Sequence, residues 1–137
     1  MKSPAVDTLT PILRISFPHE DRLGRGKMEL LEHIRETGSI SAAGRAMDMS
    51  YRRAWLLIDD MNQCFRHTVV SAKPGGSQGG GAVLTEFGTE LVRDYRAIES
   101  AASTAAKKRL RGLEAALRAS KAKTAAPKKT SIRRRKP

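Results

Sequence analysis

The sequence has few aromatic residues, one cysteine and no long apolar run. Phe, Trp and Tyr make up 4% of its 137 residues, so we expect a small core built from Leu, Ile, Ala and Met. The single cysteine, Cys64, excludes an intrachain disulfide and fits a reducing cytosol. No stretch approaches the roughly 18–20 apolar residues of a membrane span, and the N-terminal residues do not resemble a secretory signal. These absences predict a cytoplasmic protein of one domain, with or without a tail.

Acidic residues are almost absent from the end of the chain. Residues 1–106 contain 13 Lys and Arg and 13 Asp and Glu, whereas residues 107–137 contain 13 Lys and Arg and one acidic residue, Glu114. The net charge of +12 therefore lies in the last 31 residues. Residues 119–137 include one large aliphatic side chain, which is too little apolar surface to offset the entropy of ordering, so we predict a disordered basic tail.

A basic tail of this kind is typical of proteins that bind polyanions by releasing condensed counterions. Nucleic acid is the partner that we expect for it, and the candidate contacts are Arg133, Arg134 and Arg135. The alternative is a solvated tail that only aids solubility.

Apolar spacing predicts the first elements of the fold. Alternation over residues 9–17 predicts a half-buried strand, and the following HEDRLGRG predicts a polar connector. Apolar residues at helical spacing then predict a helix over 27–37, with Gly38 as its left-handed C-terminal cap.

Two further helices follow, separated by a tight turn. Either Ser39 or Ser41 can cap a short helix over 41–47, whose small residues allow close approach to a neighbour. The pair Asp48-Met49 predicts the turn, and Ser50 can cap the next helix.

The third predicted helix spans residues 51–65 and has one apolar stripe. We expect this stripe to be buried, including its tryptophan; it consists of Ala54, Trp55, Ile58, Met61 and Phe65.

A hairpin and a long helix complete the pattern. Short β-branched segments at 68–73 and 81–85 flank a glycine-rich loop, which predicts two strands with a projecting tip. Thr85 can cap the last helix, which has apolar residues three or four apart over about thirty positions. A stripe of this length predicts a helix–helix seam with a second copy. The alternative is a helix that packs on its own domain to about Ser100 and then frays.

This order of elements predicts a mainly α fold with a small β hairpin, a winged helix-turn-helix. We divide the chain into an N-terminal arm (1–9), a winged helix-turn-helix domain (10–85), a long C-terminal helix that forms a dimer seam (86–118) and the disordered basic tail (119–137).

The fold places the first turn of the 51–65 helix where it can enter a major groove of double-stranded DNA. Arginines in that turn oppose the helix dipole but can bind guanine or phosphate, so their presence favours DNA binding over a plain solvated helix end. Lys73 at the base of the glycine hairpin and two polar residues at its tip can contact phosphate or a minor groove. The candidate DNA contacts in the domain are Ser39, Ser41, Ser50, Tyr51, Arg52, Arg53, Lys73, Ser77 and Gln78.

The string SISAAGRAMDMSYRRAWLLIDDMN, followed by PGGSQGGGAVLTEFG, resembles the DNA-binding half of the ModE family of molybdate-responsive transcription factors. The resemblance covers residues 10–105 and implies a homodimer that binds a palindromic operator near molybdenum-related genes, in the bacterial nucleoid. Arg52 stands where the family often has Lys, Ser77-Gln78 where Lys-Gly is common, and Asp48 where Gly is usual. Molybdate-binding domains follow the long helix in that family but not in this chain, so we expect a stand-alone form without a molybdate site.

Other functions have little support in the sequence. Gly75 and Gly80 have the spacing of a phosphate-binding loop, but the required Lys and Ser/Thr are absent. Cys64 and His67 have metal-like local spacing, but two ligands do not make a zinc site, so we expect no metal and no cofactor. We therefore expect that the protein is not an enzyme. An architectural protein that binds DNA without sequence preference through its tail, and an adaptor for a separate sensor subunit, remain the alternatives to a sequence-specific regulator.

Overall fold

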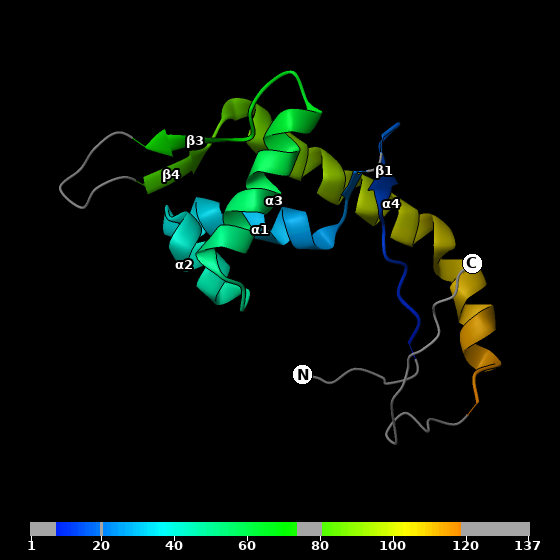
Figure 1. Ribbon diagram of the computed structural model, residues 1–137. Helices are drawn as coiled ribbons and strands as arrows, with labels where there is room; N and C mark the ends of the chain where they lie inside the picture. The colour runs from blue at the N-terminus through cyan, green and yellow to red at the C-terminus, as the bar shows by residue number, and fades with distance from the viewer. Residues whose placement is uncertain (1–7, 20, 74–80, 119–137) are drawn as a thin grey trace. The chain divides into compact units, whose positions relative to one another are not determined.

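The computed structural model describes residues 8–19, 21–73 and 81–118 (Figure 1). The chain divides into two compact units: Ile12–Ala102, and the segments on either side of it. The elements along the chain are β1 (Ile15–Ser16), β2 (Arg22–Leu23), α1 (Arg25–Thr37), α2 (Ile40–Ala46), α3 (Tyr51–Cys64), β3 (Val70–Lys73), β4 (Gly81–Leu84) and α4 (Glu86–Ala115). This order confirms the predicted winged helix-turn-helix, with one strand added.

The predicted strand over 9–17 is wrong in extent. Only Ile15 and Ser16 are paired, with Leu23 and Arg22 of β2, a strand that lies inside the predicted polar connector. The alternation in the sequence reports burial rather than pairing, because the apolar side chains of this segment pack against the core. Upstream of β1, the carbonyl of Leu13 accepts a hydrogen bond from the Tyr95 hydroxyl at 2.7 Å, so a side chain takes the place of a partner strand.

The core of the Ile12–Ala102 unit is small and aliphatic, as its composition predicts. Tyr95 is its one aromatic member, and burial raises the pKa of this hydroxyl. Three half-buried phenylalanines, Phe17, Phe65 and Phe87, pack against this core. Phe65 makes edge-on contacts with the other two, with ring centroids 5.5 and 5.0 Å apart. The buried apolar residues are Leu23, Met28, Leu30, Leu31, Ile34, Ala43, Ala54, Ile58, Met61, Val69, Val70, Ala82, Leu84, Val92 and Tyr95.

The β3–β4 hairpin is tied to the end of α1. Gly38 ends that helix with a φ of 70°, which confirms the predicted left-handed cap, and its N–H donates to the Ile34 carbonyl at 2.8 Å. The Gly38 carbonyl then accepts from the N–H of Ala82 in β4 at 2.9 Å. Figure 1 shows the hairpin beside α2 and α3 as a result.

Helix α4 begins at the predicted cap and is continuous over thirty residues. The Thr85 hydroxyl accepts from the N–H of Gly88 at 2.9 Å. The helix ends at Ala115 rather than at 118, and it does not fray near Ser100. Despite this length, no helix in the described ranges is both long and apolar enough to cross a membrane.

Candidate nucleic-acid interface

Helices α2 and α3 meet closely because α2 carries a glycine at the contact. A Cβ on Gly44 would lie 3.2 Å from the Met49 carbonyl oxygen and 3.3 Å from the Ala54 side chain. The turn between the helices folds back on the same residue, since the N–H of Met49 donates to the Gly44 carbonyl at 2.9 Å. Small residues on α2 therefore set the position of α3.

The turn itself depends on Asp48. Its φ of 60° is left-handed, a conformation that Asp tolerates better than most residues. This confirms that the turn forms with Asp at this position.

Two serines predicted as DNA contacts serve as helix caps. The Ser39 hydroxyl accepts from the Ala42 N–H, and the Ser50 hydroxyl accepts from the Arg53 N–H, each at 3.0 Å. Ser41 does not cap α2; it lies in the helix, and its hydroxyl accepts from Arg45 at 3.1 Å. The capping of α3 confirms that the helix begins at Tyr51.

The first turn of α3 presents its polar side chains to solvent. Tyr51, Arg52 and Arg53 are all exposed, whereas Ala54, on the next position, is fully buried. The exposed end of α3 therefore combines two guanidinium groups, a phenol and the positive end of the helix dipole, all of which favour a negatively charged partner.

The prediction that Trp55 lies in the core is wrong. Its side chain is 45% exposed, while its neighbours on the stripe, Ala54, Ile58 and Met61, are buried. Trp55 lies about 100° around the helix from Ala54, at the edge of the stripe. No core side chain covers that edge in the described part of the chain, because it faces an open groove.

This groove runs between α2, α3 and the β3–β4 hairpin and has a volume of about 500 Å³. Tyr51 and Trp55 lie on one wall, Ser39 and Ser41 at the end of α2, and Ser71 on the strand opposite. The structure therefore brings three of the predicted DNA contacts together in one groove: Ser39, Ser41 and Tyr51. We call this groove the wing groove.

Arg53 faces a different groove. It lines a hollow of about 590 Å³ together with three further cations that sequence reasoning missed, Arg14, Arg22 and Lys27. Asp21 lies at the same hollow, and the Lys27 ammonium donates to the Arg22 carbonyl at 2.9 Å. We call this hollow the basic groove. Its cations come from separate turns of the chain, and no local spacing in the sequence signals that they converge.

The remaining predicted contacts are divided between described and undescribed segments. Lys73 is the exposed last residue of β3 and pairs with Gly81 of β4. Ser77, Gln78, Arg133, Arg134 and Arg135 lie outside the described residues, as does the predicted tail.

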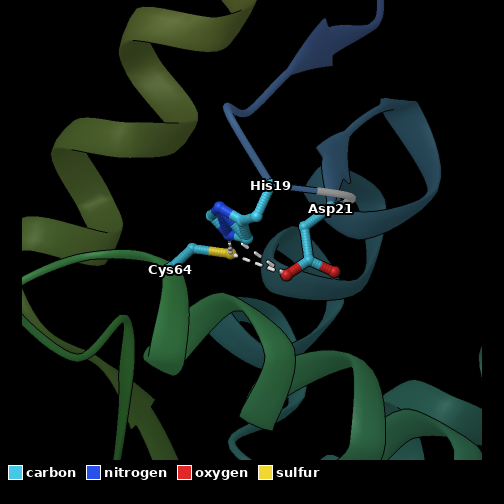
Figure 2. A group of neighbouring side chains, drawn as sticks. All are labelled: His19, Asp21 and Cys64. Atoms are coloured by element: carbon cyan, nitrogen blue, oxygen red, sulfur yellow. Dashed lines mark hydrogen bonds and ion pairs between the residues drawn. The ribbon is translucent and has the colours of Figure 1, made fainter.

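Cys64 and His67, whose spacing in the sequence is metal-like, do not form a pair of ligands in the structure. The ring of His67 packs on Phe87 at 5.6 Å, whereas Cys64 meets His19 and Asp21 of the β1–β2 turn (Figure 2). The Cys64 thiol donates to Asp21 at 3.4 Å, and burial together with this hydrogen bond raises the pKa of the thiol to about 11. The sequence gives no sign of this cluster, because its members lie on segments more than forty residues apart.

Known proteins that are similar to this chain over its N-terminal half include the following three. The molybdenum-pterin-binding protein MopB of Rhodobacter capsulatus is 48% identical over 79 residues, 58% of this chain and 29% of that protein. The DNA-binding transcriptional dual regulator ModE of Escherichia coli K12 is 44% identical over 69 residues, 50% of this chain and 26% of that protein. The molybdenum transport protein ModE of Azotobacter vinelandii is 42% identical over 73 residues, 53% of this chain and 27% of that protein.

The chain thus spans less than a third of the length of these curated relatives. No protein-family model matches it.

Proposed function

Because the N-terminal half of this chain is homologous to ModE-family regulators, we propose that the protein is a sequence-specific transcriptional regulator. It binds double-stranded DNA and acts without catalysis. The observation that carries this proposal is the exposed, basic first turn of α3, flanked by the wing groove on one side and the basic groove on the other.

Each groove suits a different part of a DNA duplex. Tyr51 and the two arginines beside it face outward from a helix end that can enter a major groove, where Arg binds guanine O6 and N7 in a bidentate manner. The basic groove gathers four cations, Arg14, Arg22, Lys27 and Arg53, which suits a phosphate strand that passes along the other side of α3.

We propose a homodimer that binds a palindromic site. Support comes from apolar side chains that are exposed on α4, where Ile98 is 47% and Leu113 59% exposed; Leu117, just beyond the end of the helix, is 42% exposed. Burying such a stripe against a second copy would remove apolar surface from water, and two-fold symmetry in the protein calls for two-fold symmetry in the site. Leu113→Glu should yield monomers in sedimentation equilibrium, while Arg111→Glu on the same helix should leave the dimer intact.

The names of two relatives mention molybdenum, so we propose promoters of molybdenum-related genes as the targets. We also propose that this chain acts on DNA in the cytoplasm, at the bacterial nucleoid, and that it holds no molybdate site. Molybdate should then leave its melting temperature unchanged, and a saturable shift at micromolar molybdate would contradict this part of the proposal.

The test of sequence-specific binding is selection of bound DNA from a random duplex library at about 150 mM salt, where non-specific attraction is screened. We expect a palindromic consensus. Arg52→Ala should cost about 1–3 kcal/mol of binding and relax the preference at one position. Arg53→Ala removes a cation of the basic groove and should weaken binding to all sequences alike. Arg66→Ala, beyond the opposite end of α3, is the matched control and should change little.

A second candidate function is architectural DNA binding without sequence preference. It is favoured by the net charge of +12, all of which lies in the last 31 residues. If it is correct, deletion of 119–137 abolishes most of the affinity, and the two arginine variants bind normally. If the regulator proposal is correct, the deletion only flattens the dependence of affinity on salt and leaves the consensus unchanged.

A further inference from the structure

A polar cluster lies at the far end of α3 from the proposed DNA contacts. Cys64 is the last residue of that helix, and His19 and Asp21 lie in the turn between β1 and β2. Figure 2 shows the three side chains pointing toward one another. The Cys64 sulfur lies 3.7 Å from His19 Nε2 and 3.4 Å from Asp21 Oδ2, and the last two atoms are 3.4 Å apart.

These distances match the edges of a tetrahedral zinc site. Zinc binds sulfur at about 2.3 Å, nitrogen at about 2.0–2.1 Å and oxygen at about 2.0–2.2 Å. Ligands at tetrahedral angles with these bond lengths lie about 3.4–3.6 Å from one another. By contrast, 3.4 Å between His19 Nε2 and Asp21 Oδ2 is too long for a charge-assisted hydrogen bond, which favours about 2.7–2.9 Å.

The arrangement does not suit a catalytic triad. In a triad the nucleophile and the acid bind different nitrogens of the imidazole, whereas Cys64 and Asp21 both approach Nε2 of His19. Three donor atoms that surround one point are what a shared cation requires.

We propose that His19, Asp21 and Cys64 bind one Zn²⁺ ion, with water as the fourth ligand. Thiolate and imidazole ligands favour zinc over magnesium or calcium. The thiol proton passes to solvent on binding, so that a thiolate, a carboxylate and a neutral imidazole balance the charge of the cation. His19 and Asp21 have 54% and 39% of their side chains exposed, which leaves a path for the ion and its water.

Neighbouring groups hold two of the ligands in place. The ring of Phe17 stacks on His19 with centroids 5.4 Å apart, and the Phe17 N–H donates to the Asp21 carbonyl at 3.0 Å. The ion would join the β1–β2 turn to the C-terminal end of α3. This proposal does not depend on DNA binding, since metal binding can be measured without DNA.

The test is titration of the metal-free full chain with Co²⁺, followed by displacement with Zn²⁺. We expect one ion per chain and an absorption band from charge transfer between thiolate and cobalt, which Zn²⁺ removes. Cys64→Ser should lower the affinity for Zn²⁺ at least about 100-fold. Loss of a group that only hydrogen-bonds a metal ligand typically costs about 10–100-fold, and loss of a ligand itself should cost at least as much. His19→Gln and Asp21→Asn should each weaken it, while His67→Gln, the matched control, should not.

Absence of the thiolate band, or equal affinity in Cys64→Ser, would overturn the proposal. A second measurement avoids variants that fail to fold. Cys64 is the only cysteine in the chain, so alkylation of the wild-type protein reports on this thiol alone. Saturating Zn²⁺ should protect Cys64 from alkylation, and an unchanged rate of modification would contradict the proposed site.

Discussion

Arg96 of α4 forms a bidentate ion pair with Glu32 of α1, in which the guanidinium Nε and Nη2 lie 3.0 and 2.7 Å from the two carboxylate oxygens. A third donor of the same guanidinium, Nη1, binds Glu99 at 2.8 Å, and Arg25 lies 3.4 Å from that carboxylate. The hydrogen bonds from Arg96 hold the pKa of Glu32 below its ordinary value, and those carboxylates raise the pKa of Arg96. This network joins the long helix to α1.

The ion pair predicts a dependence of stability on pH. Because the pKa of Glu32 is lowered in the folded state, its contribution is fully present above the ordinary value of 4.5 and is lost as pH falls through the lowered pKa. Glu32→Gln should lower the free energy of unfolding at pH 7 by about 0.5–1 kcal/mol, since the pair is partly solvent-screened. In urea titrations, the difference between variant and wild type should shrink below pH 4.5. A difference that stays constant down to the acid limit would contradict this account.

Two glycines of α4 should respond to alanine in opposite directions. A Cβ on Gly88 would lie 2.1 Å from the Val69 carbonyl oxygen, because the first turn of α4 packs on the backbone before β3. At Gly112, no described heavy atom beyond the neighbouring residues and backbone of the helix itself lies within 4 Å of the same position. Gly88→Ala should therefore destabilise the fold by more than about 1–3 kcal/mol, as overpacking does. Gly112→Ala should raise helix stability by up to about 1 kcal/mol. Thermal unfolding followed by circular dichroism should show a lower melting temperature for Gly88→Ala and a higher one for Gly112→Ala. Equal shifts in the two variants would count against the close contact at Gly88.

Ser50 allows stability to be separated from DNA binding. Its hydroxyl caps α3, so Ser50→Ala should cost about 1 kcal/mol of stability. Asp is an equally good cap and favours the helix dipole, so Ser50→Asp should unfold like wild type. The same carboxylate adds negative charge at the start of α3, where the hydroxyl of residue 50 meets the Arg53 N–H, and should weaken DNA binding at least tenfold. Binding by Ser50→Asp with wild-type affinity would place the DNA interface elsewhere.

Local chemistry in the sequence predicts the helix ends and turns well. Gly38, Asp48 and Ser50 adopt the expected conformations because each depends on its own φ or on a hydrogen bond two or three residues away. The order of elements follows, since the apolar periodicities are unambiguous for helices of thirteen residues or more.

Features set by tertiary contact could not be predicted in the same way. The two-residue strand β2 forms only because it meets β1, and it lies inside a segment whose sequence predicts a polar connector. Trp55 fits the apolar stripe by spacing, yet the neighbouring hairpin leaves that side of α3 open. The meeting of Cys64 with His19 depends on where the β1–β2 turn packs, which no pattern within either segment records.

The exposure of Trp55 gives a final prediction about the wing groove. Because nearly half of this side chain contacts solvent, Trp55→Ala should destabilise the fold less than Ile58→Ala, which removes a buried side chain and should cost about 2–5 kcal/mol. Trp55 is the only tryptophan, so its fluorescence reports on this groove alone. Binding of a selected duplex should change its emission, and the change should be lost in Arg53→Ala at the same DNA concentration. If emission stays constant while anisotropy of labelled DNA shows binding, the duplex does not approach the wing groove.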